Sequence, residues 1–293
     1  MTAQRKLRYV IISPVRDEER YIEGALRSVT GQTHKPEIWV IVDDGSRDRT
    51  REIVNRYTSA HTFIRVIETT RDGPREPGGG VVRAFNHGLP EVSNLEFDVI
   101  VKLDCDLTFE SDYFEKLLVQ FERNPRLGIC SGVYSEQSSS GSWHQVPMPW
   151  YHAAGACKAV RKACWTEIDG FVACRGWDTI DELRARSRGW DTQHCADLRM
   201  LHHKPEGSGV GSKATNIMLG EIFYRTRGSL LFFAIKLLDR SRRKPVGTGA
   251  LAMLWGYLRA AARRMPPLVT EIEGREYRKL LRARLWGSFR RAN

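Results

Sequence analysis

Residues 7–32 read LRYVIISPVRDEERYIEGALRSVTGQ and place an apolar run, a charged loop and an amphipathic segment in direct succession. The apolar run covers residues 7–15. After the loop, apolar residues recur at the spacing of one helix face until Gly31 ends the pattern. These residues are Ile22, Ala25, Leu26 and Val29. The stretch therefore predicts a strand, a loop and a helix.

The same order returns further along the chain. IWVIVDDGS (38–46) is a run of strand formers that ends in turn residues, DRTREIVNRY (48–57) is helical in character, and FIRVIE (63–68) is a third strand candidate. We expect two more helices near Val81–Leu89 and Asp112–Arg123, and strand edges with loops over 128–150. Strands that alternate with helices indicate an α/β protein with a doubly wound, mostly parallel sheet that has helices on both faces.

Composition and length are those of a folded protein. Of 293 residues, 41% are hydrophobic and 28% charged, and no segment approaches the roughly 18 to 20 apolar residues that span a bilayer. Acidic residues follow the first apolar run too closely for a signal peptide, so we expect a cytoplasmic protein. The six cysteines form no CxxC pair, which argues against a zinc ribbon or a disulfide framework.

Positive charge is concentrated at the C-terminal end. The net charge is +11, and residues 225–293 carry 17 Lys and Arg against 4 Asp and Glu. GSLLFFAIKLLDRSRRKP (228–245) and GALAMLWGYLRAAARRMPP (249–267) each set an apolar segment beside a basic cluster. Such helices suit peripheral contact with an anionic membrane. Two alternatives are packing on the rest of the chain and formation of a homodimer. Nucleic acid binding is disfavoured because no recognised module is present.

Two carboxylates interrupt the apolar stretch VKLDCDLTF (101–109). If the stretch is one strand, Asp104 and Asp106 lie on the same side, roughly 6 to 7 Å apart. At an effective dielectric constant near 20 they repel by about 2 to 3 kcal/mol, which favours a bound cation. Oxygen ligands suit Mg²⁺ or Mn²⁺. The alternative is a pair of solvent-exposed strand-end aspartates. Asp44, in VDDGS (42–46), is also ambiguous, because Asp-Gly-Ser is ordinary turn chemistry.

Taken together, five segments resemble the inverting family 2 glycosyltransferases, which have a GT-A fold. The segments are VIISPVRDEERYIEGALRSVTGQT, IWVIVDDGSRDRT, RAFNHG, VKLDCDLTF and EIDGF…GWDTIDELRARSRGW, and they span roughly residues 7 to 210. The resemblance implies a catalytic domain at 1–224, with a nucleotide-binding half to about 127 and an acceptor half at 128–224. Residues 225–293 would then form a basic, amphipathic helical tail.

The resemblance also implies roles for individual residues. Asp104 and Asp106 would form the DXD motif, which holds the ribose and a divalent metal on the diphosphate. Both are candidate metal ligands, with Asp106 the better one and Asp104 the better ribose contact. The nucleotide pocket would be lined by Pro14, Arg16, Asp17 and Asp44. Two positions depart from the family pattern. Arg16 and Asp17 stand where an aromatic residue and Asn are frequent. The family's Ala-Arg-Asn is Ala84-Phe85-Asn86 here, and Arg83 lies one place before it.

Further residues would complete the catalytic site. Counting back from Gly189 places Asp178 at the position of the family's general base, with Asp181 as second choice. The alternative for Asp178 is a helix N-cap. His203 or His202 would lie near the metal, and strand alternation allows only one of them to face it.

The sequence thus predicts a metal-dependent inverting glycosyltransferase. Its donor would be a nucleotide diphosphate sugar, and its acceptor a hydroxyl of a glycan or of a lipid-linked, nascent cell envelope polysaccharide. Trp143, Trp150 and Tyr151 would stack on acceptor sugars. The alternatives are a nucleotidyltransferase of related fold, for which the first strand lacks a glycine-rich phosphate loop, and a non-catalytic protein that binds sugar nucleotides or membranes.

Overall fold

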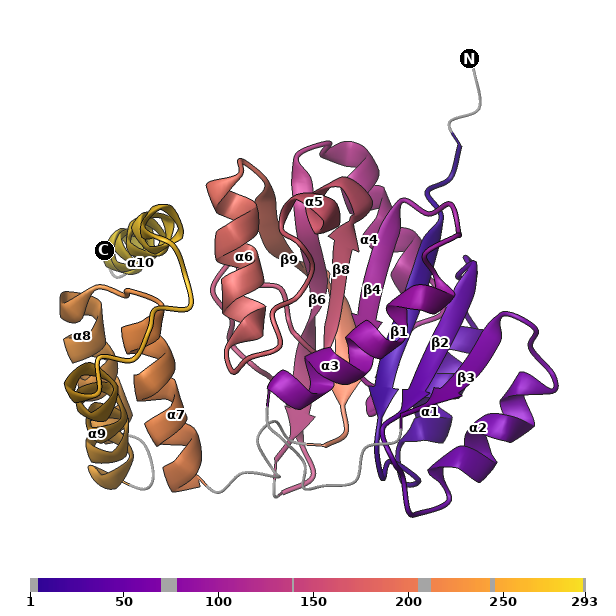
Figure 1. The fold of residues 1–293 in the computed structure, drawn as a ribbon, viewed down its shortest axis with the longest axis horizontal. Helices are drawn as coiled ribbons and strands as arrows, with labels where there is room; N and C mark the ends of the chain where they lie inside the picture. Colours follow the sequence, from indigo (N-terminus) through magenta and orange to yellow (C-terminus); the bar gives the residue numbers. More distant parts are fainter. Residues whose placement is uncertain (1–4, 70–77, 139, 205–211, 243–245, 292–293) are drawn as a thin grey trace. The chain divides into compact units, whose positions relative to one another are not determined.

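A computed structural model describes residues 5–69, 78–138, 140–204, 212–242 and 246–291 (Figure 1). The chain divides into two compact units. The first, the sheet unit, comprises Met1–Cys174 and Gly189–Pro205, and the second, the helical unit, comprises Arg175–Arg188 and Glu206–Asn293. Each unit has its own hydrophobic core.

The sheet unit is built on one sheet with the strand order β3-β2-β1-β4-β8-β6-β9-β5, and β7 pairs with β6. Its strands are β1 (Tyr9–Val15), β2 (Ile38–Asp43), β3 (Ile64–Glu68), β4 (Val99–Leu103), β5 (Leu107–Phe109), β6 (Leu127–Gln137), β7 (Trp143–Gln145), β8 (Cys157–Arg161) and β9 (Asp191–His202). Strands β1 to β4 are parallel, whereas β8 runs antiparallel to β4 and β6. The predicted α/β sheet, mostly parallel in its first half, is confirmed.

Helices cover both faces of this sheet (Figure 1). The helices of the unit are α1 (Ile22–Thr30), α2 (Thr50–Thr58), α3 (Gly79–His87), α4 (Tyr113–Arg123) and α5 (Lys162–Glu167). Tyr9 and Ile11 of β1 belong to the core formed with α1, α2 and α4. Ile12 points the other way and lies under Gly88, at the end of α3. Helices thus cover both faces of β1, which explains why the strand is apolar on both sides.

The local predictions for this first half hold. All four predicted apolar residues of α1 are buried, and so are the four apolar residues that line one face of α4. The order β3-β2-β1-β4 reverses direction between β1 and β4. In open α/β sheets such a reversal leaves a crevice beyond the carboxyl ends of the two strands.

Two predictions are wrong. Residues 101–109 do not form one strand, because the chain leaves β4 after Leu103, turns at Cys105 and Asp106, and enters β5 beside β9. Residues 128–137, expected as strand edges and loops, belong to the long inner strand β6. Glycine at position 132 allows the backbone of β9 to approach β6 closely, because a Cβ there would lie 2.3 Å from the carbonyl oxygen of Leu198.

The helical unit contains α6 (Trp177–Ser187), α7 (Ser212–Arg225), α8 (Leu230–Arg242), α9 (Thr248–Ala262) and α10 (Glu271–Arg291). The predicted helical extension is thus present, and its core includes Phe223, Phe233, Met253 and Leu281. None of the helices in the described ranges has the length and apolar character needed to cross a bilayer. Helices α7 and α9 touch through their backbones. A Cβ on Gly220 would lie 1.9 Å from Met253 O, and one on Gly256 would lie 2.0 Å from Ile217 O.

Replacing Gly256 by alanine should therefore destabilise the helical unit. We expect Gly256→Ala to cost about 1 to 3 kcal/mol, because α7 and α9 must move apart. Gly249→Ala on the same helix is the matched control, since its Cβ would meet only the end of the Arg240 side chain. Thermal unfolding followed by circular dichroism checks both, and equal melting temperatures would contradict the predicted contact.

Candidate functional site

The carboxyl ends of β1, β2 and β4 bring together residues that are far apart in sequence. Asp17 follows β1, Asp44 follows β2, and Asp104 follows β4. Strand β1 lies between the other two. Backbone hydrogen bonds hold the first residue after two of these strands: Asp44 N donates to Val15 O at 2.9 Å, and Asp104 N donates to Ala156 O at 2.7 Å. The candidate site is this end of the sheet.

The loops after β1 and β2 hold each other in place. Asp17 has a left-handed backbone with φ of 54°, a conformation that Asp tolerates better than most residues. Its N–H donates to Ser46 Oγ, and its Oδ1 accepts the N–H of Arg47 at 2.8 Å. Asp44 Oδ1 accepts the hydroxyl proton of Thr69 at 2.7 Å. Asp17 thus joins the loop after β1 to the loop after β2 by hydrogen bonds. Pro14 and Arg16, its neighbours in the sequence, are half-buried.

Lys102 neutralises the first carboxylate of the DXD segment. Its ammonium lies 2.5 Å from Asp104 Oδ1 and 2.8 Å from Gly155 O, and the residue is 3% exposed. Burial raises the pKa of Asp104, and the charge of Asp106 adds to this, whereas Lys102 opposes both. The predicted strand geometry is wrong here, because Asp104 and Asp106 flank a turn and contact different partners.

Asp106 contacts His202 at the end of β9. Asp106 Oδ1 and His202 Nε2 are 3.4 Å apart, and both residues are buried. Burial alone would raise the pKa of Asp106, but the interaction with His202 lowers it overall. Burial would in turn lower the pKa of His202, but Asp106 raises it. On the other side of the ring, His202 Nδ1 lies 3.5 Å from Glu136 Oε1.

His203 contacts a different set of side chains. Its Nε2 lies 2.8 Å from Thr108 Oγ1, and its ring meets Trp143 edge to face with centroids 5.3 Å apart. Burial lowers the pKa of His203. Trp143 is 38% exposed, so one side of the indole is open to a ligand. Of the two histidines, His202 is therefore the one whose ring contacts the Asp106 carboxylate, whereas His203 meets Asp106 through its backbone N–H, which donates to Asp106 O at 3.0 Å.

The other predicted site residues lie on helices. Arg83 is exposed on α3. Asp178 lies in the first turn of α6, whose N-cap is Gly176, so the alternative of an Asp178 N-cap is wrong. Asp181 is fully buried, and its Oδ1 accepts the N–H of Glu182. Residues 205–211, which follow Lys204, lie outside the described residues.

Asp106 and His202 fit a divalent cation. Among the described residues, Asp106 Oδ1 is a buried oxygen atom without a hydrogen-bond partner. Two donor atoms on one Mn²⁺ or Mg²⁺ are about 3 Å apart, close to the distance between Asp106 Oδ1 and His202 Nε2. Within the described ranges, no three His, Cys, Asp or Glu side chains are grouped as metal ligands. A cation here would take its remaining ligands from phosphate oxygens and water.

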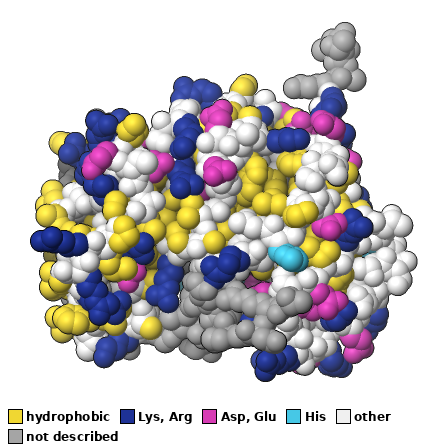
Figure 2. Space-filling view, viewed as in Figure 1, with side chains coloured by type: hydrophobic (Ala, Val, Ile, Leu, Met, Phe, Trp, Pro, Cys, Tyr) yellow, Lys and Arg dark blue, Asp and Glu magenta, His cyan; other side chains and the backbone are white. Residues whose placement is uncertain are grey.

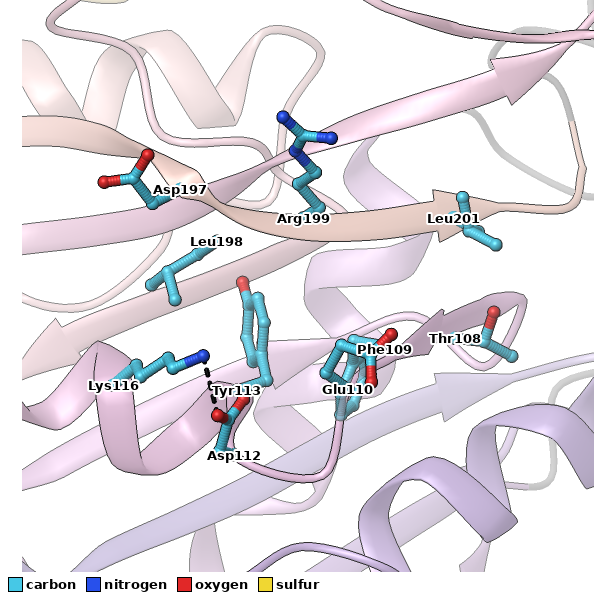
Figure 3. Close-up of a pocket in the computed structure, with 10 residues that line it drawn as sticks. All are labelled: Thr108, Phe109, Glu110, Asp112, Tyr113, Lys116, Asp197, Leu198, Arg199 and Leu201. Atoms are coloured by element: carbon cyan, nitrogen blue, oxygen red, sulfur yellow. Dashed lines mark ion pairs between the residues drawn. The ribbon is translucent and has the colours of Figure 1, made fainter.

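A pocket of about 400 Å³ adjoins this site (Figure 3). It is lined by β5, β9 and the start of α4, and Figure 3 shows Lys116 paired with Asp112 at one end and Thr108 at the other. None of the sequence-predicted site residues is part of its lining. Thr108, which contacts His203, connects the pocket to the candidate site.

Sequence reasoning missed three residues of the site. Lys102 looked like part of an apolar strand, although a lysine two places before the acids was a usable signal. Glu136 lies in the range expected to form loops. Glu18 is buried and pairs with Lys204 at 2.5 Å, a contact between the β1 loop and the end of β9.

The chain is similar to known proteins in sequence. The sequence model of the family described as "Glycosyl transferase family 2" matches residues 10–177. Poly-beta-1,6-N-acetyl-D-glucosamine synthase of Staphylococcus epidermidis is 27% identical over 117 residues, which is 40% of this chain and 26% of that protein. Glycosyltransferase GlyA of Streptococcus pneumoniae is 29% identical over 137 residues, or 46% and 18% of the two chains. This chain thus matches about a quarter or less of these relatives.

Solved structures share the fold. Mannosyltransferase PcManGT from Pyrobaculum calidifontis, in complex with GDP-Man and Mn²⁺, has a TM-score of 0.54 at 20% identity, covering 88% of this chain and 74% of that one. S. aureus TarS 1–349 in complex with UDP-GlcNAc has a TM-score of 0.55 at 17% identity, covering 87% and 73%.

The ion pair of Lys102 and Asp104 should contribute far more to the free energy of unfolding than a surface ion pair does. We expect Lys102→Met to cost about 3 kcal/mol or more, because it leaves a half-buried carboxylate without its partner. The double variant Lys102→Met/Asp104→Asn should cost less than the sum of its parts. The matched control is the exposed pair of Lys116 and Asp112, whose coupling should stay below about 1 kcal/mol. Urea unfolding of both double-mutant cycles is the measurement, and equal coupling energies would contradict the prediction.

Proposed function

Because the chain belongs to glycosyl transferase family 2, we propose that it moves a sugar from a nucleotide diphosphate sugar to an acceptor hydroxyl with inversion at the anomeric carbon. The observation that carries this proposal is the position of Asp44, Asp104 and Asp106 beyond β2 and β4, on either side of β1. This is where the strand order reverses, and where ligands bind in sheets of this kind.

The proposed roles of the donor-binding residues follow from their surroundings. Asp44 is half-buried and would accept a hydrogen bond from the base. Pro14, Arg16 and Asp17 would complete the nucleotide pocket, and exposed Arg83 would face the diphosphate. Asp104 already has Lys102 as its counter-charge, so it suits the neutral ribose hydroxyls better than a metal.

Asp106 and His202 are the proposed metal ligands. When bound, Mg²⁺ or Mn²⁺ would neutralise charge on the leaving diphosphate. Both residues are more than nine-tenths buried, so their positions are set before the donor binds. This arrangement limits the reorganisation that the reaction requires.

Asp178 is the proposed general base. It would take the proton of the acceptor hydroxyl while the oxygen bonds to the anomeric carbon and the bond to the diphosphate breaks. It lies in the first turn of α6. Asp181 is less suitable, because it is fully buried and holds a backbone N–H.

The acceptor is proposed to be a glycan or a lipid-linked saccharide, and Trp143 is its best-placed contact. The indole touches His203 and is partly exposed. Trp150 is also exposed, whereas Tyr151 is 5% exposed and less available for stacking on a sugar. The names of the similar proteins make UDP-GlcNAc and GDP-Man the first donors to try.

A release assay tests the proposed transfer. With a panel of nucleotide sugars, we expect Mn²⁺-dependent release of nucleoside diphosphate that EDTA abolishes. Asp178→Asn should lower the turnover rate about 10²- to 10⁴-fold and leave donor binding unchanged, because it removes only the base. Asp181→Asn is the control for the neighbouring carboxylate. Normal turnover by a folded Asp178→Asn protein would move the base elsewhere, and no release or binding of any donor would end the enzyme proposal.

We further propose that residues 225–293 attach the catalytic part, 1–224, to the cytoplasmic face of an anionic membrane. Exposed apolar residues line one side of α8 at i, i+4 and i+7, and the same spacing recurs on α9. They are Leu231, Ile235 and Leu238 on α8, and Leu251, Trp255 and Leu258 on α9, each at least 41% exposed. Figure 2 shows hydrophobic side chains over these helices with Lys and Arg among them. Apolar stripes beside basic residues match an anionic bilayer.

Vesicle flotation tests the membrane proposal. The protein should float with vesicles that contain phosphatidylglycerol and not with pure phosphatidylcholine, and salt should weaken the binding. Trp255→Ser should reduce flotation several-fold, because it removes the largest exposed apolar residue of α9. Trp150→Ser, at a similarly exposed site of the sheet unit, should have no effect. A wild-type dimer that Trp255→Ser dissociates, without any flotation, would show that the stripes bind a second copy instead.

A further inference from the structure

Glu136, His202 and Asp106 form a row across neighbouring strands. Glu136 on β6 is in register with His202 on β9, and His202 is in register with Leu107, the residue after Asp106. The imidazole therefore lies between two carboxylates: Nδ1 is 3.5 Å from Glu136 Oε1, and Nε2 is 3.4 Å from Asp106 Oδ1. The side chains of all three residues are at most 17% exposed.

The two contacts use the two ring nitrogens, and only one of these can bind a metal while the other carries a proton. At 3.5 Å from Glu136, Nδ1 makes no hydrogen bond within the described part of the chain, but the negative charge beside it favours the proton on that nitrogen and leaves the lone pair of Nε2 free. Histidine ligands in metalloproteins usually have such a partner, which fixes both the tautomer and the orientation of the ring. In this protein the free lone pair would point to the side of Asp106, whose Oδ1 is itself buried and has no hydrogen-bond partner among the described residues.

We propose that Glu136 is a positioning residue that holds His202 ready to bind the divalent cation through Nε2. The inference rests on the proposed function, because it takes Asp106 and His202 as the metal ligands. Glu136 touches neither the cation nor the donor in this proposal. It acts through the imidazole, and its place is set by the pairing of β6 with β9 and with β7, where it is in register with His144.

Mn²⁺ titration of the full-length protein tests the proposal without any turnover. Electron paramagnetic resonance reports free Mn²⁺ directly. Glu136→Gln should bind Mn²⁺ about 10- to 100-fold more weakly than the wild type, the range typical for loss of such a partner. Glu96→Gln is the control, because its side chain is 82% exposed and precedes the opposite end of β4. It should bind like the wild type.

Variants of a His202→Ala protein distinguish an effect on the His202 ring from a general loss of stability. In a His202→Ala protein, Glu136→Gln should cause no further loss of Mn²⁺ affinity, because the ring on which Glu136 acts is gone. An equal loss in both backgrounds, or a loss that appears only with a lower melting temperature, would overturn the proposal.

The test also distinguishes the inference from the function on which it rests. If the wild type binds no Mn²⁺, the metal dependence of the proposed function fails together with the inference. If the wild type and Glu136→Gln bind Mn²⁺ equally well, the inference alone is wrong.

Discussion

The reversal of strand order between β1 and β4 is the constraint on which the site depends. To one side of β1 the chain adds β2 and β3, and to the other it adds β4 and β8. The loops that leave β1 and β4 therefore turn away from each other, and their first polar residues border one crevice. Asp17 and Asp104 lie at the same end of the sheet for this reason, although they are 87 positions apart in the sequence.

Local sequence patterns were sufficient to predict this half of the molecule. The apolar residues of α1 and α4 repeat at helical spacing and are buried, and the strands β1 to β3 end where turn residues begin. Such features depend on neighbours a few residues away. The acids that follow the strands were predictable as a set for the same reason, and the roles proposed for them come from similarity to a known family.

The remainder depends on pairings between distant segments. Strand β6 contains Gly128, Gly132, Ser131 and Ser135, which locally indicate a loop, but β8 and β9 enclose it and bury most of its residues. Residues 101–109 are apolar enough for one strand, yet β4 pairs with β8 and β5 pairs with β9. The contact of Lys102 with Gly155 O and that of Glu136 with His202 form only through these pairings. Tertiary contacts override local preference in both cases.

The separation of β4 from β5 affects which loops must close before each carboxylate is held in place. Asp104 is fixed by its contacts with Lys102 and Ala156, next to the β4 and β8 pair. Asp106 and His202 meet only when β5 joins β9, and the contact of Thr108 with His203 there spans 95 residues. Closing so long a loop costs entropy that earlier contacts must offset. The two carboxylates of one short motif therefore depend on contacts of different sequence separation, and the larger loop-closure cost falls on the side of Asp106.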